Sequence, residues 1–224
     1  MQLVLISDTH CQHKALTIPE CDILIHAGDW THRGEEKLTI EFLQWFEAQT
    51  QAKHRVFIAG NHDFYPERHP ESFRTLVRTL APNCVYLEDE SVIIEGYKIH
   101  GSPVSPEFCD WAFNRYRGTD IQKHWDMIPA DTEILVVHGP VLGYGDKLSE
   151  HGSEPGVHIG CANLLNTIDS RLKNLGLVVT AHIHEGSGMY KHGDIIVVNA
   201  AVLDERYRMR NPPRIVTLPD KIVV

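Results

Sequence analysis

Residues 57–63 read FIAGNHD: a short apolar run stops at Gly60, and three polar side chains follow at once. Those side chains, Asn61, His62 and Asp63, offer an amide, an imidazole and a carboxylate. The apolar run has the composition of a buried strand. One strand end of this kind arises by chance in many proteins, so its meaning depends on how the other strands of the chain end.

Short runs of β-branched or aliphatic residues recur along the chain and read as buried strands rather than helices. They are Leu3–Ile6, Ile23–Ile25, Val56–Ile58, Val92–Ile94, Ile134–Val137, Leu177–Thr180 and Ile195–Val198. Between several of them, apolar residues at helical spacing predict helices over Glu35–Gln51, Glu71–Leu80 and Cys161–Leu172. Strands that alternate with helices indicate an α/β fold. The last third holds more strand than helix, which favours a mixed, two-sheet arrangement.

Composition limits the class of protein. The chain has 224 residues, of which 42% are hydrophobic and 23% charged, and no linker or repeat divides it, so we expect a single domain over residues 1–224. The net charge of −9 argues against a grip on duplex nucleic acid, which needs a basic face. A small anionic substrate stays compatible with this charge, because a bound metal ion can reverse the local field.

Cysteine usage and the N-terminus point to the cytoplasm. The cysteines are odd in number and scattered, without a C-x-x-C pair, which favours a reducing compartment over a disulfide framework. The N-terminal apolar run is too short for a signal peptide, and no segment reaches the length of a membrane span. We therefore expect a cytoplasmic protein that binds no membrane; its oligomeric state is left open.

Five of the predicted strands end in side chains that bind metal ions. These donors are Asp8, His10, Asp29, Asn61, His138, His182 and His184. Ligands bind at the carboxyl ends of strands in open α/β sheets. Seven donors are too many for one tetrahedral zinc site, but they suit two ions that share a bridging carboxylate. Oxygen and imidazole ligands favour Mn²⁺, our first choice, or Fe, Zn²⁺ or Co²⁺.

The polar run that follows Gly60 now has an interpretation. Two ions polarise a phosphoryl group and generate a bridging hydroxide that acts as the nucleophile. If Asn61 is a ligand, His62 lies beside that phosphoryl group and can protonate the leaving alkoxide as general acid. Asp63 is then expected to orient the His62 ring.

The set of motifs resembles the calcineurin-like metallophosphoesterase superfamily over about residues 3–200. Within it, the chain is most similar to the metallophosphoesterase-domain-containing (MPPED) subgroup, close to the class III cyclic nucleotide phosphodiesterases. The stretches that carry the resemblance are SDTH, LIHAGDW, GNHD, GSPVSPEFCDWAFNRYRG, HGPVLGYGD, HIGCANLLNTI and HIHEGSG. The resemblance implies two packed mixed β-sheets flanked by helices, a metallophosphoesterase β-sandwich with its site at the C-terminal strand ends.

The resemblance also implies a role for each donor. It assigns Asp8, His10 and His184 to one metal ion. It assigns Asn61, His138 and His182 to the other, with Asp29 as the bridge and His62 as general acid. One departure is Ala181, where the family usually has glycine; alanine resists a positive φ and brings a methyl group close to the site.

For other residues near the motifs, an ordinary structural role is at least as well supported as a functional one. His26 and His100 read as buried, hydrogen-bonded imidazoles, and Cys11 and His13 as loop residues without a role. Three further features each fit either the pocket or an ordinary structural place: His158, the pair Arg115 and Arg117, and Glu185. Trp30 fits a pocket wall or core packing. Phe108, Trp111 and Phe113 fit a partner surface or a lid.

The sequence thus predicts a dinuclear, metal-dependent phosphodiesterase acting on cyclic nucleotides or other small phosphodiesters. One metal core serves 2′,3′-cyclic, 3′,5′-cyclic and linear diesters alike, so the natural substrate is left open. The alternatives are a phosphoprotein phosphatase or nuclease of the same fold and, less favoured because every motif is filled, a non-catalytic binding scaffold.

Overall fold

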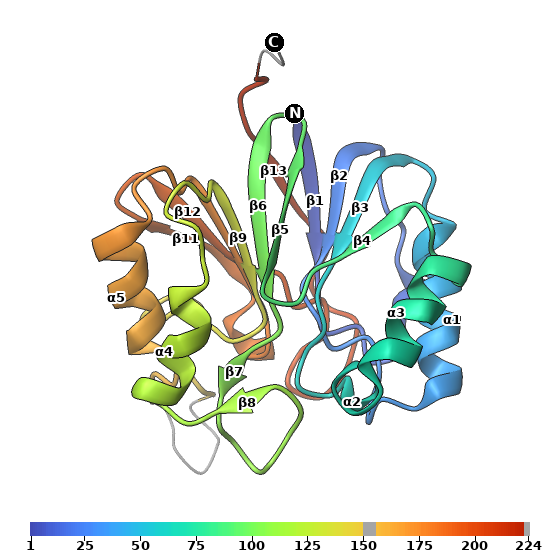
Figure 1. Ribbon diagram of the computed structural model, residues 1–224, viewed down its shortest axis with the longest axis horizontal. Helices are drawn as coiled ribbons and strands as arrows, with labels where there is room; N and C mark the ends of the chain where they lie inside the picture. Colours follow the sequence, from blue (N-terminus) through green and yellow to red (C-terminus); the bar gives the residue numbers. More distant parts are fainter. Residues whose placement is uncertain (150–155, 222–224) are drawn as a thin grey trace.

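In the computed structural model, two β-sheets form the centre of the molecule (Figure 1). The structure describes residues 1–149 and 156–221. The first sheet has five strands in the order β13 (Arg214–Thr217), β1 (Gln2–Ile6), β2 (Cys21–His26), β3 (Ala52–Phe57) and β4 (Cys84–Tyr86). The second has six, in the order β11 (Gly188–His192), β12 (Ile195–Asn199), β10 (Leu177–Thr180), β9 (Ile134–Val137), β6 (Tyr97–Ser102) and β5 (Glu90–Ile94).

Both sheets are mixed. In the first, β1 to β4 are parallel and only β13 runs antiparallel, beside β1. In the second, β6, β9, β10 and β12 are parallel, while β5 and β11 are antiparallel edge strands. The carboxyl ends of the parallel strands in each sheet therefore share one edge, which is where the sequence places the polar motifs.

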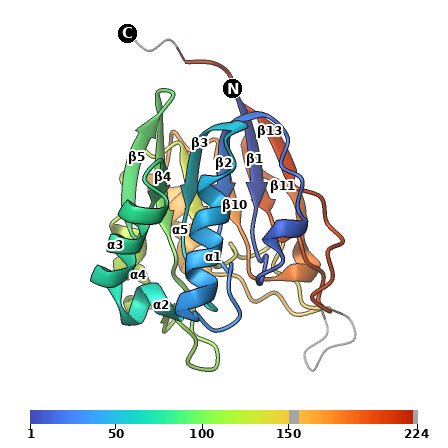
Figure 2. The same cartoon turned by 90° about the vertical axis from the view of Figure 1, so that its right-hand side faces the viewer.

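Helices cover the outer faces of the sheets (Figures 1 and 2). The helices are α1 (Glu36–Glu47), α2 (Phe64–Arg68), α3 (Pro70–Leu80), α4 (Thr119–Asp126) and α5 (Ala162–Arg171), with short 3₁₀ turns η1 (His13–Ala15) and η2 (His184–Gly186). Helices α1 to α3 lie against the first sheet, and α4 and α5 against the second. The predicted α/β sandwich of two mixed sheets flanked by helices is confirmed.

The period-2 alternation of the strands divides the core into layers. In β1, Leu3 and Leu5 pack between the two sheets, against residues such as Ile134 of β9. Val4 and Ile6 point the other way, into the cluster that contains Phe42 of α1. Successive side chains of a strand face opposite sides of a sheet, so one buried strand supports two cores.

The predicted elements are present, with shifted ends. Helix α1 ends at Glu47 rather than Gln51, because β3 already begins at Ala52. Helix α3 begins at Pro70, whose fixed φ suits the first turn of a helix. Helix α4 was not predicted, because Ile121 and Trp125 are its only buried side chains.

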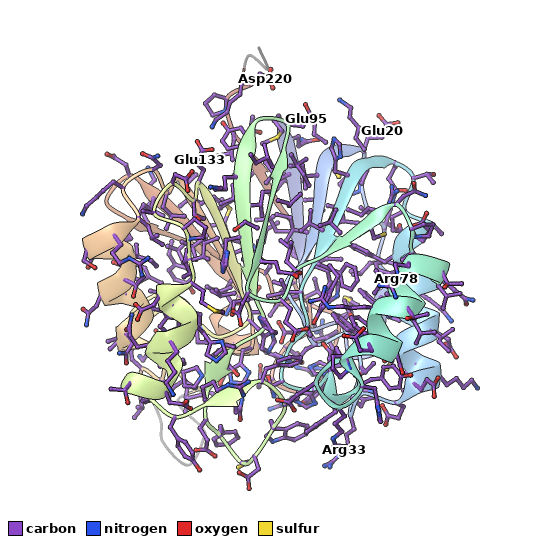
Figure 3. All side chains as sticks on the ribbon, viewed as in Figure 1. Glu20, Arg33, Arg78, Glu95, Glu133 and Asp220 are labelled. Atoms are coloured by element: carbon purple, nitrogen blue, oxygen red, sulfur yellow. The ribbon has the colours of Figure 1, made fainter. Side chains whose placement is uncertain are left out.

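A small two-stranded ribbon, β7 (Ser105–Pro106) and β8 (Asn114–Arg115), lies beyond the strand ends. Figure 3 labels Arg33 at this end of the molecule, and Glu95 and Asp220 at the opposite end. Among the described residues, no helix is both long enough and apolar enough to span a membrane.

Candidate metal centre

The fold brings all seven predicted metal donors together at one end of the two sheets. Asp8 and His10 follow β1, Asp29 follows β2, and Asn61 follows β3. From the second sheet, His138 follows β9, whereas His182 and His184 follow β10. Ligand atoms lie within 4.8 Å of one another in three groups: Asp8, His10 and His184; Asp29, His138 and His182; and His10, Asp29 and His62.

Asp29 lies between the two halves of this cluster. Its Oδ2 is 3.4 Å from His138 Nε2 on one side and 3.8 Å from His10 Nε2 on the other. Asn61 Oδ1 lies 2.8 Å from both His138 Nε2 and His182 Nδ1. The geometry matches a carboxylate shared by two adjacent cation sites.

The hydrogen bonds of two histidines show that this cluster fits cations. His10 Nδ1 lies 3.0 Å from the carbonyl oxygen of Thr31, and His184 Nδ1 lies 2.9 Å from that of Asp204. A carbonyl only accepts, so each Nδ1 carries a proton and each Nε2 faces the cluster. These two Nε2 atoms are 3.3 Å apart, a distance that requires a proton on one of them or a cation beside both. A second ring nitrogen bonded to a backbone carbonyl is typical of metal-binding histidines.

His138 follows the same rule, since its Nδ1 lies 2.9 Å from the carbonyl oxygen of Ala27. Its Nε2 then faces oxygen acceptors of Asn61 and Asp29. Burial opposes a charge on His138, yet the carboxylate of Asp29 raises the pKa of this imidazole to about 9. Burial likewise opposes a charge on His184, and Asp8 raises its pKa to about 9. Protons therefore supply positive charge where the donor set fits metal ions.

Strained backbone supports the cluster. Asp8, Asp29 and His182 have φ angles of 51°, 59° and 73°, in the left-handed region that residues other than glycine rarely adopt. Such conformations persist where the surrounding structure imposes them, often at functional sites. The positive φ falls on His182 rather than on Ala181, which is fully buried between the sheets. The alanine methyl group is therefore accommodated by the core.

His62 lies at the edge of the cluster, but Asp63 does not orient it as predicted. His62 Nδ1 lies 2.7 Å from the carbonyl oxygen of His32, so its ring is held from the main chain. The His62 backbone N–H donates to Asp29 Oδ1 at 2.8 Å. The prediction failed because the Asp63 carboxylate is occupied by other donors.

Asp63 holds two turns together instead. Its carboxylate accepts hydrogen bonds from the backbone N–H groups of Gly60 (2.9 Å), Asp29 (2.8 Å) and Thr31 (3.0 Å). The Thr31 hydroxyl adds a fourth, at 2.8 Å. The Asp63 side chain is fully buried, so it fixes the turn after β2 against the turn after β3.

Several residues have the structural roles that the sequence predicted for them. His26 is buried and bonded to Thr9 and Gly28, and His100 is buried and bonded to Ser91. Trp30 belongs to the core, where it stacks on Phe42 with ring centroids 4.6 Å apart. His13 is also in the core rather than in an idle loop, packed beside Phe42.

A cavity of about 640 Å³ opens beside the cluster. One end is formed by the donors Asn61, His182 and His184, and by His62. The other walls include Phe108, Trp111, Leu148, Ile159, Arg117, Glu107, Glu185, Glu205 and Tyr207. The cavity therefore joins the candidate metal centre to a partly apolar, partly acidic chamber.

Of the residues whose role the sequence left undecided, some line the cavity and others do not. Arg117 lines the cavity, and it donates to the carbonyl oxygen of Gly160 at 2.8 Å. Glu185 also lines it, whereas Arg115 donates to His124 and His158 pairs with the buried Asp146.

Phe108, Trp111 and Phe113 do not form one exposed patch. Phe113 is buried, whereas Trp111 lies in the cavity wall, with its ring centroid 4.1 Å from that of His62. Sequence reasoning missed Glu205 and Tyr207, which follow β12 in a polar segment that carries no metal-binding motif.

Comparison with known proteins agrees with this geometry. The family model for the calcineurin-like phosphoesterases matches residues 1–186. Metallophosphoesterase domain-containing protein 1 of Homo sapiens is 35% identical over 97% of this chain and 71% of its own length. A UPF0046 protein of Caenorhabditis elegans is also 35% identical, over 98% of this chain and 81% of its own. The chain belongs to the calcineurin-like phosphoesterase family.

Solved structures share the fold at low sequence identity. The crystal structure of the Thermus thermophilus protein TT1561 aligns with a TM-score of 0.60 at 14% identity, covering 88% of each chain. At this identity the likeness concerns the fold alone. The family uses divalent metal ions in a dinuclear site, which the groups of histidine and aspartate donors fit.

Proposed function

We propose that this protein is a dinuclear, metal-dependent phosphodiesterase that hydrolyses small phosphodiesters such as cyclic nucleotides. The observation that carries the proposal is that Asp29 approaches histidines of two adjacent donor groups, at one end of a cavity of about 640 Å³. Two ions in such a site polarise the phosphoryl group and make a water nucleophilic near neutral pH.

The donors divide between two ions around Asp29. Asp8, His10 and His184 would hold one ion, and Asn61, His138 and His182 the other. Asp29 would bridge them, since it approaches a histidine of each set. Without thiolate ligands, the set favours Mn²⁺, with Fe, Zn²⁺ and Co²⁺ as alternatives.

His62 is the proposed general acid. Its Nδ1 is bonded to the His32 carbonyl, which leaves Nε2 to carry a proton to the leaving oxygen. The ring lines the cavity, beside Trp111 and next to the ligand Asn61. A sugar alkoxide needs this proton to depart, whereas p-nitrophenolate is a good leaving group without it.

The cavity supports a small substrate. Its volume lies within the range of pockets that enclose drug-sized ligands. Phe108, Trp111 and Ile159 provide apolar wall, which suits an organic group attached to the phosphate. The net charge of −9 disfavours long nucleic acids. All five cysteines are free, which supports the proposed location in the reducing cytoplasm.

The first test is hydrolysis by metal-stripped protein with and without added Mn²⁺. We expect Mn²⁺-dependent hydrolysis of 2′,3′-cyclic AMP and of bis-p-nitrophenyl phosphate. Activity on the second compound alone would keep the chemistry and reject the cyclic nucleotide. Inactivity on both, after metal loading is verified, would support a non-catalytic scaffold.

The second test concerns His62. In His62→Asn, turnover of 2′,3′-cyclic AMP should fall roughly 100-fold or more, in the range of general acid catalysis. Turnover of bis-p-nitrophenyl phosphate should fall much less, because its leaving group needs no proton. His69→Asn, at an exposed position, is the matched control. Equal losses on both substrates would contradict the general-acid role.

A further inference from the structure

Residues 203–209 form a braced turn beyond the last family motif. The turn is closed by a bridge between Leu203 and Met209. The Tyr207 N–H donates to the carbonyl oxygen of Asp204 at 2.8 Å, and the Asp204 carboxylate accepts from the Arg208 N–H and from Arg208 Nε. These hydrogen bonds make the turn a fixed support rather than a loose loop.

The turn is also tied directly to the candidate metal centre. The Asp204 carbonyl oxygen is the partner of His184 Nδ1, at 2.9 Å. From the other side, Gln12 Nε2 donates to the Tyr207 carbonyl oxygen at 3.0 Å. The turn thus joins the segments that follow β10 and β1, each of which carries predicted ligands.

The ring of Tyr207 lies over those ligands. Its centroid is 4.9 Å from that of His10 and 5.2 Å from that of His184, both edge-to-face. Its backbone φ is 57°, a conformation that strains any residue with a side chain. The strain is therefore maintained at a position that places an aromatic ring beside two histidines of one proposed ion.

The position of Tyr207 allows it to contact a ligand in the cavity. It lines the cavity, and 46% of its surface is exposed. The structure shows no hydrogen bond from its phenol to any of the described residues. A phenol carries its proton at neutral pH and can donate to an anionic oxygen, and such charge-assisted bonds are strong.

We propose that Tyr207 is a substrate-contacting residue whose phenol donates a hydrogen bond to the phosphoryl group at the Asp8, His10 and His184 end of the centre. This inference rests on the proposed function. The residue also lies outside the matched family region, which ends at residue 186. The contact is therefore supplied by the C-terminal part of this chain rather than by the motif set.

The test separates the phenol hydroxyl from the ring. We compare the full-length, Mn²⁺-loaded wild-type protein with Tyr207→Phe, and with Tyr116→Phe as the matched control at a tyrosine that is 68% exposed. Inorganic phosphate is the probe, and calorimetry measures its affinity. We expect Tyr207→Phe to weaken phosphate binding roughly 10-fold or more, as for loss of a hydrogen bond to a charged group. Mn²⁺ affinity should be unchanged, and Tyr116→Phe should match the wild type.

Three results would overturn the inference. One is an unchanged phosphate affinity in Tyr207→Phe. Another is a loss of Mn²⁺ affinity in that variant, because the residue would then support the ligands rather than contact the substrate. The third is a wild-type protein that binds no phosphate. A wild type that binds phosphate through Tyr207 but hydrolyses no diester would refute the proposed reaction and leave the contact standing.

Discussion

Backbone carbonyl groups set the chemistry of the site at the scale of single residues. His10, His138 and His184 each use Nδ1 on a main-chain oxygen, which leaves Nε2 of each ring facing the centre. The same device holds His62 through His32. No carboxylate is needed to orient these four rings, and the Asp63 carboxylate instead accepts hydrogen bonds from the turns after β2 and β3.

This role makes Asp63 a stability determinant. Asp63→Ala would leave the buried N–H groups of Gly60, Asp29 and Thr31 without their acceptor. A buried donor without a partner costs about 1–3 kcal/mol, so we expect the free energy of unfolding to fall by roughly 3 kcal/mol or more.

Urea denaturation of the metal-free protein measures this change. The control is Asp194→Ala, an exposed residue in the turn between β11 and β12, which should stay within about 0.5 kcal/mol of the wild type. If the two variants proved equally stable, the Asp63 hydrogen bonds would carry little of the fold.

At the scale of elements, the turns after β2 and β3 are packed so closely that their glycines have no room for a side chain. A Cβ on Gly60 would lie 2.3 Å from Asp29 Oδ1 and 2.6 Å from His138 Cε1. Gly28 has a φ of 99°, and a Cβ there would lie 2.7 Å from His138 Nδ1. The contact between the two strand ends thus depends on the absence of a methyl group.

Gly60→Ala should therefore displace Asp29 or His138 and impair metal binding. We expect Mn²⁺ affinity to fall roughly 10-fold or more, in the range seen when groups that position metal ligands are altered. Gly176→Ala is the control, since a Cβ there meets nothing within 4 Å. Titration with Mn²⁺ tests both variants, and wild-type affinity in Gly60→Ala would show that the turns can shift without cost.

At the scale of the whole molecule, the candidate site joins the two sheets. Asp8, His10, Asp29 and Asn61 come from the first sheet, and the three remaining histidines from the second. The core between the sheets is apolar, so the donors meet only at the end where both sets of parallel strands terminate. Bound ions would therefore link one half of the sandwich to the other.

Removal of metal should lower global stability. A ligand that binds only the folded state at 1,000 times its Kd contributes about 4 kcal/mol. For a chain of this length, that corresponds to a rise in Tm of roughly 8–16 °C. Thermal unfolding with Mn²⁺ and with excess EDTA measures the difference. The control is Asp29→Asn, in which the gain from Mn²⁺ should shrink; the same Tm with and without metal in the wild type would contradict the proposal.

Local patterns in the sequence determined much of the molecule. Short apolar runs identified strands such as β9 and β10 to the residue, because burial between two layers demands continuous Val, Ile and Leu. The candidate metal donors could also be identified, since each lies shortly after a strand and the carboxyl ends of parallel strands meet at one edge of a sheet. Element ends shifted where a neighbouring element began, as at Ala52.

Only the tertiary structure decided how those donors are held and what faces them. The partners of the imidazole rings are carbonyl groups of Thr31, Ala27 and Asp204, and every residue type carries such a group, so no side-chain pattern marks them. Tyr207 reaches His10 across nearly the whole chain because β1 and the segment after β12 meet at one end of the sandwich. Sequence specified the chemical groups, whereas long-range packing selected their tautomers, their strain and the wall of the cavity.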